Sequence, residues 1–391
     1  MPISRAALTV QLLNNREAIA AIGAEWDALS HRGASGVSAT SVWYDVWSDV
    51  FARTQASRVI AVTDETGALR GVLPLTERSR TIGGLRVRVL EMAGESVACG
   101  DHLGLVSNAP DDDVWRAALP LLHTLGRDVD VVDLRSLTAM TAPGRFLGSL
   151  APTGWRAAPA TGSVAPRLAL NGSAAAFEQS LSANRRQQLR RRQRALDEAH
   201  PGHAFVCNDE RVSIDSALDD LERLHQLLWS SRGVAGAFAD PLFGAFVRRF
   251  ARAAHTRGWL RLHQLVVEGE TVASLLAYHW EGVGSYYTSG WNPAYAEWHV
   301  GELLLAHVIR TAAEAGLSSF DLGRGADAYK SRFAADPVPL LAATWSTSAR
   351  GQLAVSAHQL ALRVQREWNR WRTRVSRVFA MRRRTTGVPS R

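Results

Sequence analysis

The spacing of apolar positions predicts an α/β unit in the first part of the chain. Helical stretches have apolar residues every three or four positions, whereas strands alternate or form short continuous apolar runs. The predicted elements, in order, are helices over 15–30 and 40–53, strands over 58–64, 69–78, 85–92 and 101–106, a helix over 111–126, and a strand over 130–134.

The same order of elements returns in the second part of the chain. Strands are predicted over 259–267, 271–280 and 284–290, followed by a helix over 300–315 and a strand over 318–322. The two closing strands share an Asp-Leu pair, Asp133-Leu134 and Asp321-Leu322. This repetition indicates an internal duplication of one α/β unit. A segment rich in Pro and Gly over 151–166 predicts the linker.

The end of the chain predicts a basic amphipathic helix. Apolar residues recur every three or four positions, and arginines fall between them. Residues 350–391 hold eleven Arg and one Glu, so the first 349 residues contribute −2 to the net charge of +8. We expect the last dozen residues to be disordered. The apolar positions are Leu360, Val364, Trp368, Trp371, Val375 and Val378.

Composition and motifs argue against a disulfide-rich protein, a metalloprotein, and the hydrolase, kinase and ATPase classes. The two cysteines, Cys99 and Cys207, form neither a disulfide framework nor a zinc-binding spacing. The scattered histidines predict no metal site, and no nucleophile elbow or phosphate-binding loop with Lys occurs. Since no signal peptide or membrane-spanning run is recognisable, a cytoplasmic protein is expected, with a peripheral membrane position as an option.

A single lysine marks the candidate catalytic region. Of the 45 basic residues, 44 are Arg and one is Lys330. A compact ammonium performs functions that a planar guanidinium cannot imitate, so its retention favours a catalytic role. Lys330 follows the strand end at Asp321, with Tyr329 beside it. An ammonium there could stabilise an oxyanion, while Asp321 could accept a proton or serve only as a buried ion-pair partner.

A second candidate region is the start of the helix over 300–315. The segment His299-Val300-Gly301-Glu302 opens this helix after a strand that carries Tyr287. A helix N-terminus presents unpaired N–H groups and a positive dipole end, which suit a pyrophosphate. A Gly before a helix is often only a packing feature, so this signal is weak by itself.

The order of these motifs resembles GNAT-like acetyltransferases of the CelD type, from bacterial cellulose-synthesis clusters. It is also similar to FemAB-type transferases, which add amino acids to peptidoglycan precursors. The resemblance covers about residues 175–340. It rests on the basic helix at 184–191, Leu265–Ala273, Tyr286–Tyr295, Val300–Leu305, Phe320–Gly323 and Tyr329–Phe333.

The resemblance implies a fold of tandem GNAT-like domains, with mixed central sheets flanked by helices. The expected divisions are a degenerate domain over 1–155, an acyltransferase domain over 165–348, and the basic tail over 349–391. The implied reaction is acyl transfer, most simply acetyl transfer, from acyl-CoA to an amine or hydroxyl acceptor, without a metal. Lys330, Asp321 and Tyr329 are then the catalytic candidates. Donor-binding candidates are His299, Val300, Gly301, Glu302 and Tyr287.

The basic residues leave partners open. Arg185, Arg186, Arg190 and Arg332 are candidates for gripping an anionic substrate, although such a run is also typical of a solvated face. Nucleic acid is not the expected partner, because the body of the chain is near neutral. The tail could pack on the body, lie on a membrane, or dock to a polysaccharide-synthesis complex. Rival functions are a non-catalytic accessory of such a complex and an aminoacyl-tRNA-dependent transferase.

Overall fold

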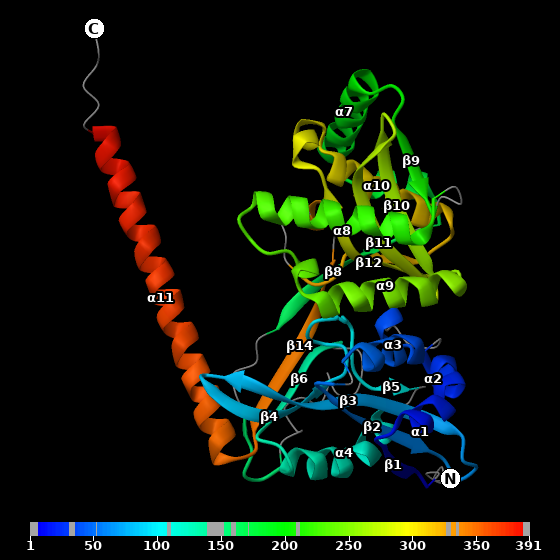
Figure 1. The fold of residues 1–391 in the computed structure, drawn as a ribbon, viewed down its shortest axis with the longest axis vertical. Coiled ribbons are helices and arrows are strands. Elements are labelled where there is room, and N and C mark those ends of the chain that lie inside the picture. The colour runs from blue at the N-terminus through cyan, green and yellow to red at the C-terminus, as the bar shows by residue number, and fades with distance from the viewer. Residues whose placement is uncertain are drawn as a thin grey trace.

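Figure 1 shows the fold of the chain in a computed structural model. The described residues are 7–30, 36–51, 53–107, 111–138, 152–157, 162–170, 172–208, 212–325, 330–333 and 336–385. The chain forms two α/β halves joined through one continuous mixed sheet, with a long helix leaving the first half.

The first half follows the predicted order of elements closely. One difference is the predicted strand over 101–106, where only β5 (Val106–Ser107) is extended and the preceding residues form a loop. The remaining elements are β1 (Thr9–Leu13), α1 (Arg16–Ala21), α2 (Gly23–Ser30), α3 (Ser41–Phe51), β2 (Ala56–Thr63), β3 (Leu69–Ile82), β4 (Leu85–Met92), α4 (Asp111–Arg127) and β6 (Val131–Thr138).

The second half contains the predicted strands and helices together with additional elements. The helices that precede its central strands are amphipathic and cover the sheet. Its elements are α6 (Ala174–Ser180), α7 (Ala183–Ala199), β9 (Ala204–Cys207), α8 (Ile214–Ser231), α9 (Pro241–Thr256), β10 (Leu260–Val267), β11 (Glu270–Trp280), β12 (Val283–Trp291), η4 (Pro293–Trp298), α10 (Val300–Glu314), β13 (Ser319–Asp321) and η5 (Lys330–Arg332).

The two halves exchange strands at their junction. The sheet order is β1-β2-β3-β4-β6-β14-β8-β13-β12-β11-β10-β9. β8 (Ser163–Ala169) follows the first half in sequence but pairs with β13 of the second, and β14 (Asp336–Ser346) follows the second half but pairs with β6 of the first. The predicted linker over 151–166 therefore ends inside β8, where Ala165 is buried and lies opposite Val338 of β14.

Each half contains one parallel strand pair at the same place. β4 runs parallel to β6, and β12 runs parallel to β13, while the other sheet neighbours are antiparallel. A helix, α4 or α10, makes each parallel connection, as a crossover requires. This repeated topology agrees with the duplication expected from the sequence.

The halves also share one apolar core. Trp43 on α3 contacts Phe246 and Phe250 on α9, with ring centroids 4.7 Å apart in both pairs, and Tyr287 on β12 at 5.8 Å. The buried residues around this aromatic cluster come from both halves and form a single contiguous group. Burial across the junction therefore holds the two units together.

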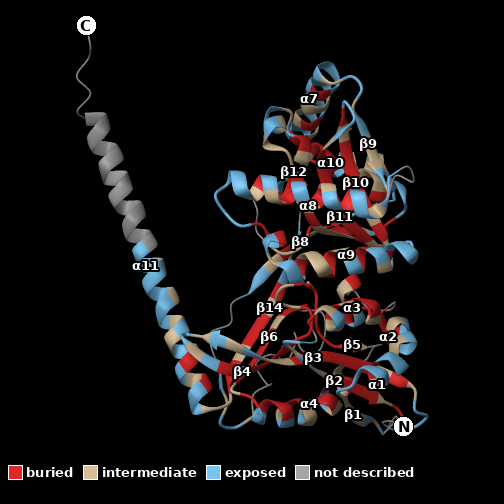
Figure 2. Ribbon diagram, viewed as in Figure 1, coloured by how far each residue is buried: buried red, intermediate tan, exposed pale blue. Residues whose placement is uncertain are grey.

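The tail forms one helix, α11 (Ala349–Thr385), which continues further than the sequence predicted. It begins against the hairpin of β3 and β4, where Ala354 is buried beside Val87, Val89 and Val131. Beyond this contact it runs away from the body, and its described outer turns are exposed (Figures 1 and 2). The expectation that the last dozen residues are disordered is wrong for 380–385, which are helical.

Candidate functional site

A cavity of about 430 Å³ lies between the end of β12 and the start of α10. It is the candidate site because several predicted residues line it together. The lining residues are His225, Leu228, Trp229, Arg232, Leu275, Tyr286, Tyr287, Thr288, Ser289, Trp291, Ala296, His299, Val300, Gly301, Glu302, Leu305 and Lys330.

The parallel strands part to open this cavity. β12 pairs with β13 only as far as Ser285 opposite Asp321, and then continues along the cavity to Trp291 with only β11 paired to it. On its other side, β12 carries a bulge: Tyr286 lies opposite Ala277 and Thr288 opposite Leu276, so Tyr287 is the extra residue. A bulge leaves the extra residue outside the regular ladder, which makes backbone groups available beside the cavity.

The start of α10 forms another wall. His299 adopts a left-handed conformation with φ of 53° and makes no side-chain cap. The first N–H groups of a helix lack partners within the helix, so this end can receive an anion. A Cβ on Gly301 would stand 2.6 Å from Cδ1 of Trp291. The glycine is therefore required by packing against Trp291.

Glu302 lies inside a cluster of arginines. Its carboxylate forms ion pairs with Arg185 and Arg192, and Arg332 Nη1 lies 3.6 Å from Oε1. Burial lowers the pKa of Arg185, while the charge of Glu302 acts in the opposite direction. Three guanidiniums against one carboxylate leave the helix start with an excess of positive charge.

Lys330 is buried at the edge of the cavity. Its side chain is only 4% exposed, and Nζ donates to the carbonyl oxygens of Arg324 at 2.7 Å and Gly323 at 3.2 Å. The ammonium also lies 5.8 Å from the centre of the Tyr286 ring. These contacts fix a positive charge in a shielded position beside the strands. Tyr329 lies outside the described residues.

Asp321 is held in a separate buried network. Its Oδ2 lies 2.6 Å from Nε2 of His102 and 3.0 Å from Nη2 of Arg167, and Oδ1 accepts from the backbone of Gly323. Burial alone would raise its pKa, but the hydrogen bond from His102 and the nearby positive charges lower the pKa overall. The described residues lining the cavity do not include Asp321.

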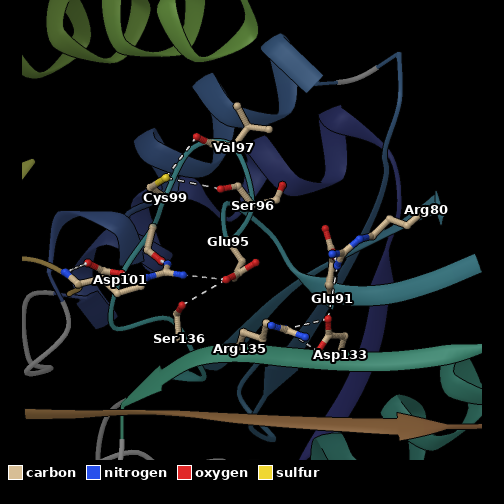
Figure 3. Close-up of polar contacts among 12 residues, drawn as sticks. Arg80, Glu91, Glu95, Ser96, Val97, Cys99, Asp101, Asp133, Arg135 and Ser136 are labelled. Atoms are coloured by element: carbon tan, nitrogen blue, oxygen red, sulfur yellow. Dashed lines mark hydrogen bonds and ion pairs between the residues drawn. The ribbon is translucent and has the colours of Figure 1, made fainter. Parts of the chain in front are cut away.

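The first half repeats this arrangement at Asp133. Asp133 lies opposite Glu91 in the parallel pair of β4 and β6, at the register where Asp321 lies opposite Ser285 in the second half. Figure 3 shows Asp133 facing Arg80 and Arg135, and the Nε of Arg135 is 2.8 Å from Oδ1. A buried carboxylate with arginine partners is thus a feature of the repeat itself.

A loop of the first half reaches the strand end of the second. Arg324, which follows Asp321, pairs with Asp101 at 2.8 Å and Glu95 at 3.0 Å. Glu95 also receives a hydrogen bond from Ser136, as Figure 3 shows. The hydroxyl of Tyr287 donates to the carbonyl of Ala98 at 2.8 Å, and burial raises its pKa. Both halves therefore position the candidate site.

Two predicted arginines lie elsewhere. Arg186 and Arg190 line a second cavity, of about 450 Å³, on another side of α10. Arg186 donates to the carbonyl oxygens of Glu178 and Gln179, which end α6, and Arg190 lies 3.8 Å from the Glu178 carboxylate. The four arginines predicted as one group are thus divided between the Glu302 cluster and this second cavity.

Sequence reasoning missed His225, which lines the main cavity from α8. Its side chain is buried, and burial lowers its pKa below 6.5. Nδ1 lies 3.4 Å from Oε1 of Gln226. An imidazole that is neutral at neutral pH can accept a proton. No motif marks this histidine, because only the packing of α8 on β12 brings it to the site.

Among the described residues, no group of three or more His, Cys, Asp or Glu is arranged to hold a metal ion. Within the same part of the chain, no helix is both long and apolar enough to cross a bilayer.

The repeated topology and the opened strand pair define a fold of tandem GNAT-like units. Residues 183–331 match the family model described as "Acetyltransferase (GNAT) domain". This match lies in the half that contains the cavity and Lys330. No curated protein matches the chain.

Solved structures share this fold across most of the chain. The crystal structure of FemX has a TM-score of 0.61 at 10% identity, covering 85% of this chain and 96% of that one. The C-terminal domain of a protein described as a lysylphosphatidylglycerol synthetase, from Agrobacterium fabrum, has a TM-score of 0.53 at 13% identity, covering 86% and 94%. A weaker similarity, with a TM-score of 0.45 at 13% identity, is to a tandem GNAT protein from the clavulanic acid biosynthesis pathway, covering 88% and 99%.

Proposed function

We propose that this chain transfers an acyl group from acyl-CoA to an amine or hydroxyl acceptor in the cavity beside Lys330. The observation that carries the proposal is the buried ammonium of Lys330 at the edge of a cavity opened by diverging parallel strands. A positive charge held there without rearrangement stabilises negative charge that develops during acyl transfer.

The start of α10 is suited to the pyrophosphate of the donor. Its first N–H groups and the arginines around Glu302 provide hydrogen-bond donors and positive charge. Glu302 does not oppose an anion there, because Arg185 and Arg192 neutralise it. A helix start with the single Gly301 followed by Glu302 is therefore compatible with CoA.

The chemical step joins the acceptor to the acyl carbon and breaks the thioester. The acceptor nitrogen or oxygen attacks the carbonyl carbon, the C–S bond breaks, and the sulfur leaves with its electron pair. Lys330 stabilises negative charge on the carbonyl oxygen. His225 accepts the proton released by the acceptor, and this proton then reaches the departing sulfur. Asp321 is a positioning residue. It accepts a hydrogen bond from the backbone N–H of Gly323, and the carbonyl oxygen of Gly323 accepts a hydrogen bond from Lys330.

Calorimetric titration with CoA and acetyl-CoA tests donor binding, and release of free thiol tests transfer to a panel of amines and sugars. Lys330→Arg should keep the fold and donor affinity but lower transfer by roughly 100-fold, because a guanidinium cannot occupy the compact ammonium site. His255→Gln, at an exposed residue of α9 outside the cavity, is the surface control. Full activity of the Lys330→Arg variant would refute the role of Lys330.

An aminoacyl-tRNA-dependent reaction is the second candidate, favoured by the arginines on α7 and the similarity in fold to FemX. RNA binding that weakens steeply with salt, without CoA binding, would support it over the CoA reaction.

The role in cellulose or other envelope polysaccharides that the CelD-type resemblance implies stays a prediction. Transfer to polysaccharide-derived acceptors in the thiol assay would support it, whereas an intact fold that binds neither donor would favour the accessory function.

A further inference from the structure

The helix α11 exposes a row of large apolar side chains. Leu353, Leu360, Val364 and Trp368 are between 57% and 63% exposed, whereas large apolar residues elsewhere in the described chain are mostly buried. Their separations of seven, four and four residues place them along one side of the helix. The same spacing continues in the sequence to position 378.

The beginning of this helix is anchored, so the exposed row is held at a distance from the body. Ala354 packs on Val87, Val89 and Val131, and a Cβ on Gly83 would stand 2.3 Å from the Ala354 carbonyl oxygen. From this contact the 37-residue helix extends outward, as Figure 1 shows. At 1.5 Å per residue it is about 55 Å long.

Charge identifies the kind of partner. Residues 350–391 carry eleven Arg and one Glu, while the rest of the chain sums to −2. Pairing two copies of this segment would bring like charges together, which disfavours a helix dimer. An anionic bilayer surface offers both an apolar layer for the exposed row and negative charge for the arginines, and Trp suits the boundary between them.

We infer that α11 is a membrane-surface helix that holds this protein on anionic lipid bilayers. The apolar row enters the boundary between headgroups and acyl chains, and the arginines contact lipid phosphates. Each Arg near an anionic surface strengthens partitioning by roughly fivefold. The inference does not depend on the proposed acyl transfer, because α11 contributes no described residue to the cavity at Lys330.

Vesicle flotation with the full chain tests this inference. The protein should float with vesicles of phosphatidylcholine and phosphatidylglycerol but not with phosphatidylcholine alone, and added salt should weaken the binding. The triple variant Leu360→Ser/Val364→Ser/Trp368→Ser should lose at least roughly tenfold in partitioning. Since these side chains are exposed, its circular dichroism and thermal transition should match the unmodified chain.

The matched control changes exposed apolar residues of the body, Val234→Ser and Leu242→Ser, and should leave flotation unchanged. Equal partitioning of the triple variant, or no binding to anionic vesicles, would overturn the inference. A dimer that dissociates in the triple variant, seen by sedimentation without vesicle binding, would assign the row to a second copy. Salt-sensitive RNA binding without vesicle binding would assign the charge to nucleic acid.

Discussion

Replacing Asp321 with Asn separates a structural from a catalytic role for this carboxylate. The substitution keeps the size of the side chain and an acceptor for the Gly323 N–H, but it removes the charge that faces Arg167 and His102. The Asp321 side chain is 4% exposed, so water cannot replace the lost charge. We therefore expect Asp321→Asn to lower the free energy of unfolding and to have no direct effect on proton transfer.

The expected magnitude follows from the partners. Breaking a buried ion pair costs about 3–5 kcal/mol, because the remaining charge is left without compensation. Arg167 retains 19% exposure, so water partly compensates its charge and the lower end of about 3 kcal/mol applies. The lowered pKa of Asp321 means that its stabilisation is present above pH 3.8 and is lost as pH falls through the lowered pKa. A measurement at neutral pH therefore captures all of it.

Urea unfolding of the full chain at neutral pH, with thiol release measured in parallel, is the assay. Asp215→Asn is the control, because Asp215 pairs with Arg252 on the surface, where both side chains are more than half exposed. That control should lose less than about 1 kcal/mol. The reasoning is refuted if Asp321→Asn unfolds within about 1 kcal/mol of the unmodified chain and yet has no transferase activity.

Three further predictions concern the cavity and the core. If His225 is the proton acceptor, kcat/KM should fall at low pH with a midpoint below 6.5, because burial lowers its pKa; a midpoint above 6.5 would contradict this. Burial and the neighbouring positive charges lower the pKa of His263 to about 3, so only the unfolded chain gains this proton below pH 6.5. Unfolding energy should therefore drop by about 2 kcal/mol at pH 5 through this group, and His263→Gln should show a shallower pH dependence in urea titrations. Gly301→Ala should cost about 1–3 kcal/mol through its contact with Trp291, and less when combined with Trp291→Leu; additive losses would argue against that contact.

The sequence predicted those features that depend on local pattern or on repetition. Periodicity located the hairpin of β2 and β3 and the helix α10, and the shared Asp-Leu pair indicated the duplication that β6 and β13 now display. The distinction of Lys330 also came from composition, since a single lysine among 45 basic residues requires no structure to notice. Its burial beside a cavity is the structural support for that prediction.

Long-range partners could not be predicted in this way. The partners of Asp321 are His102, 219 residues away, and Arg167, 154 residues away, and neither lies in a recognisable motif. Arg186 and Arg190 are adjacent to Arg185 in the pattern of the basic helix, yet they line another cavity because α7 presents different sides to α6 and α10. A run of like charges gives no information on which side each residue faces.

The strand exchange explains why a boundary drawn from composition does not separate two independent units. A fragment over 165–348 would contain β14 without β6, its partner from the first half, while a fragment over 1–155 would expose the edge of β6 that β14 covers. An uncovered strand edge offers unpaired backbone groups to other chains. The aromatic contacts of Trp43 with Phe246 and Phe250 would be lost at the same time. Since the loop at Asp101 also holds Arg324 beside Lys330, the first half is needed to position the candidate site as well as to complete the sheet.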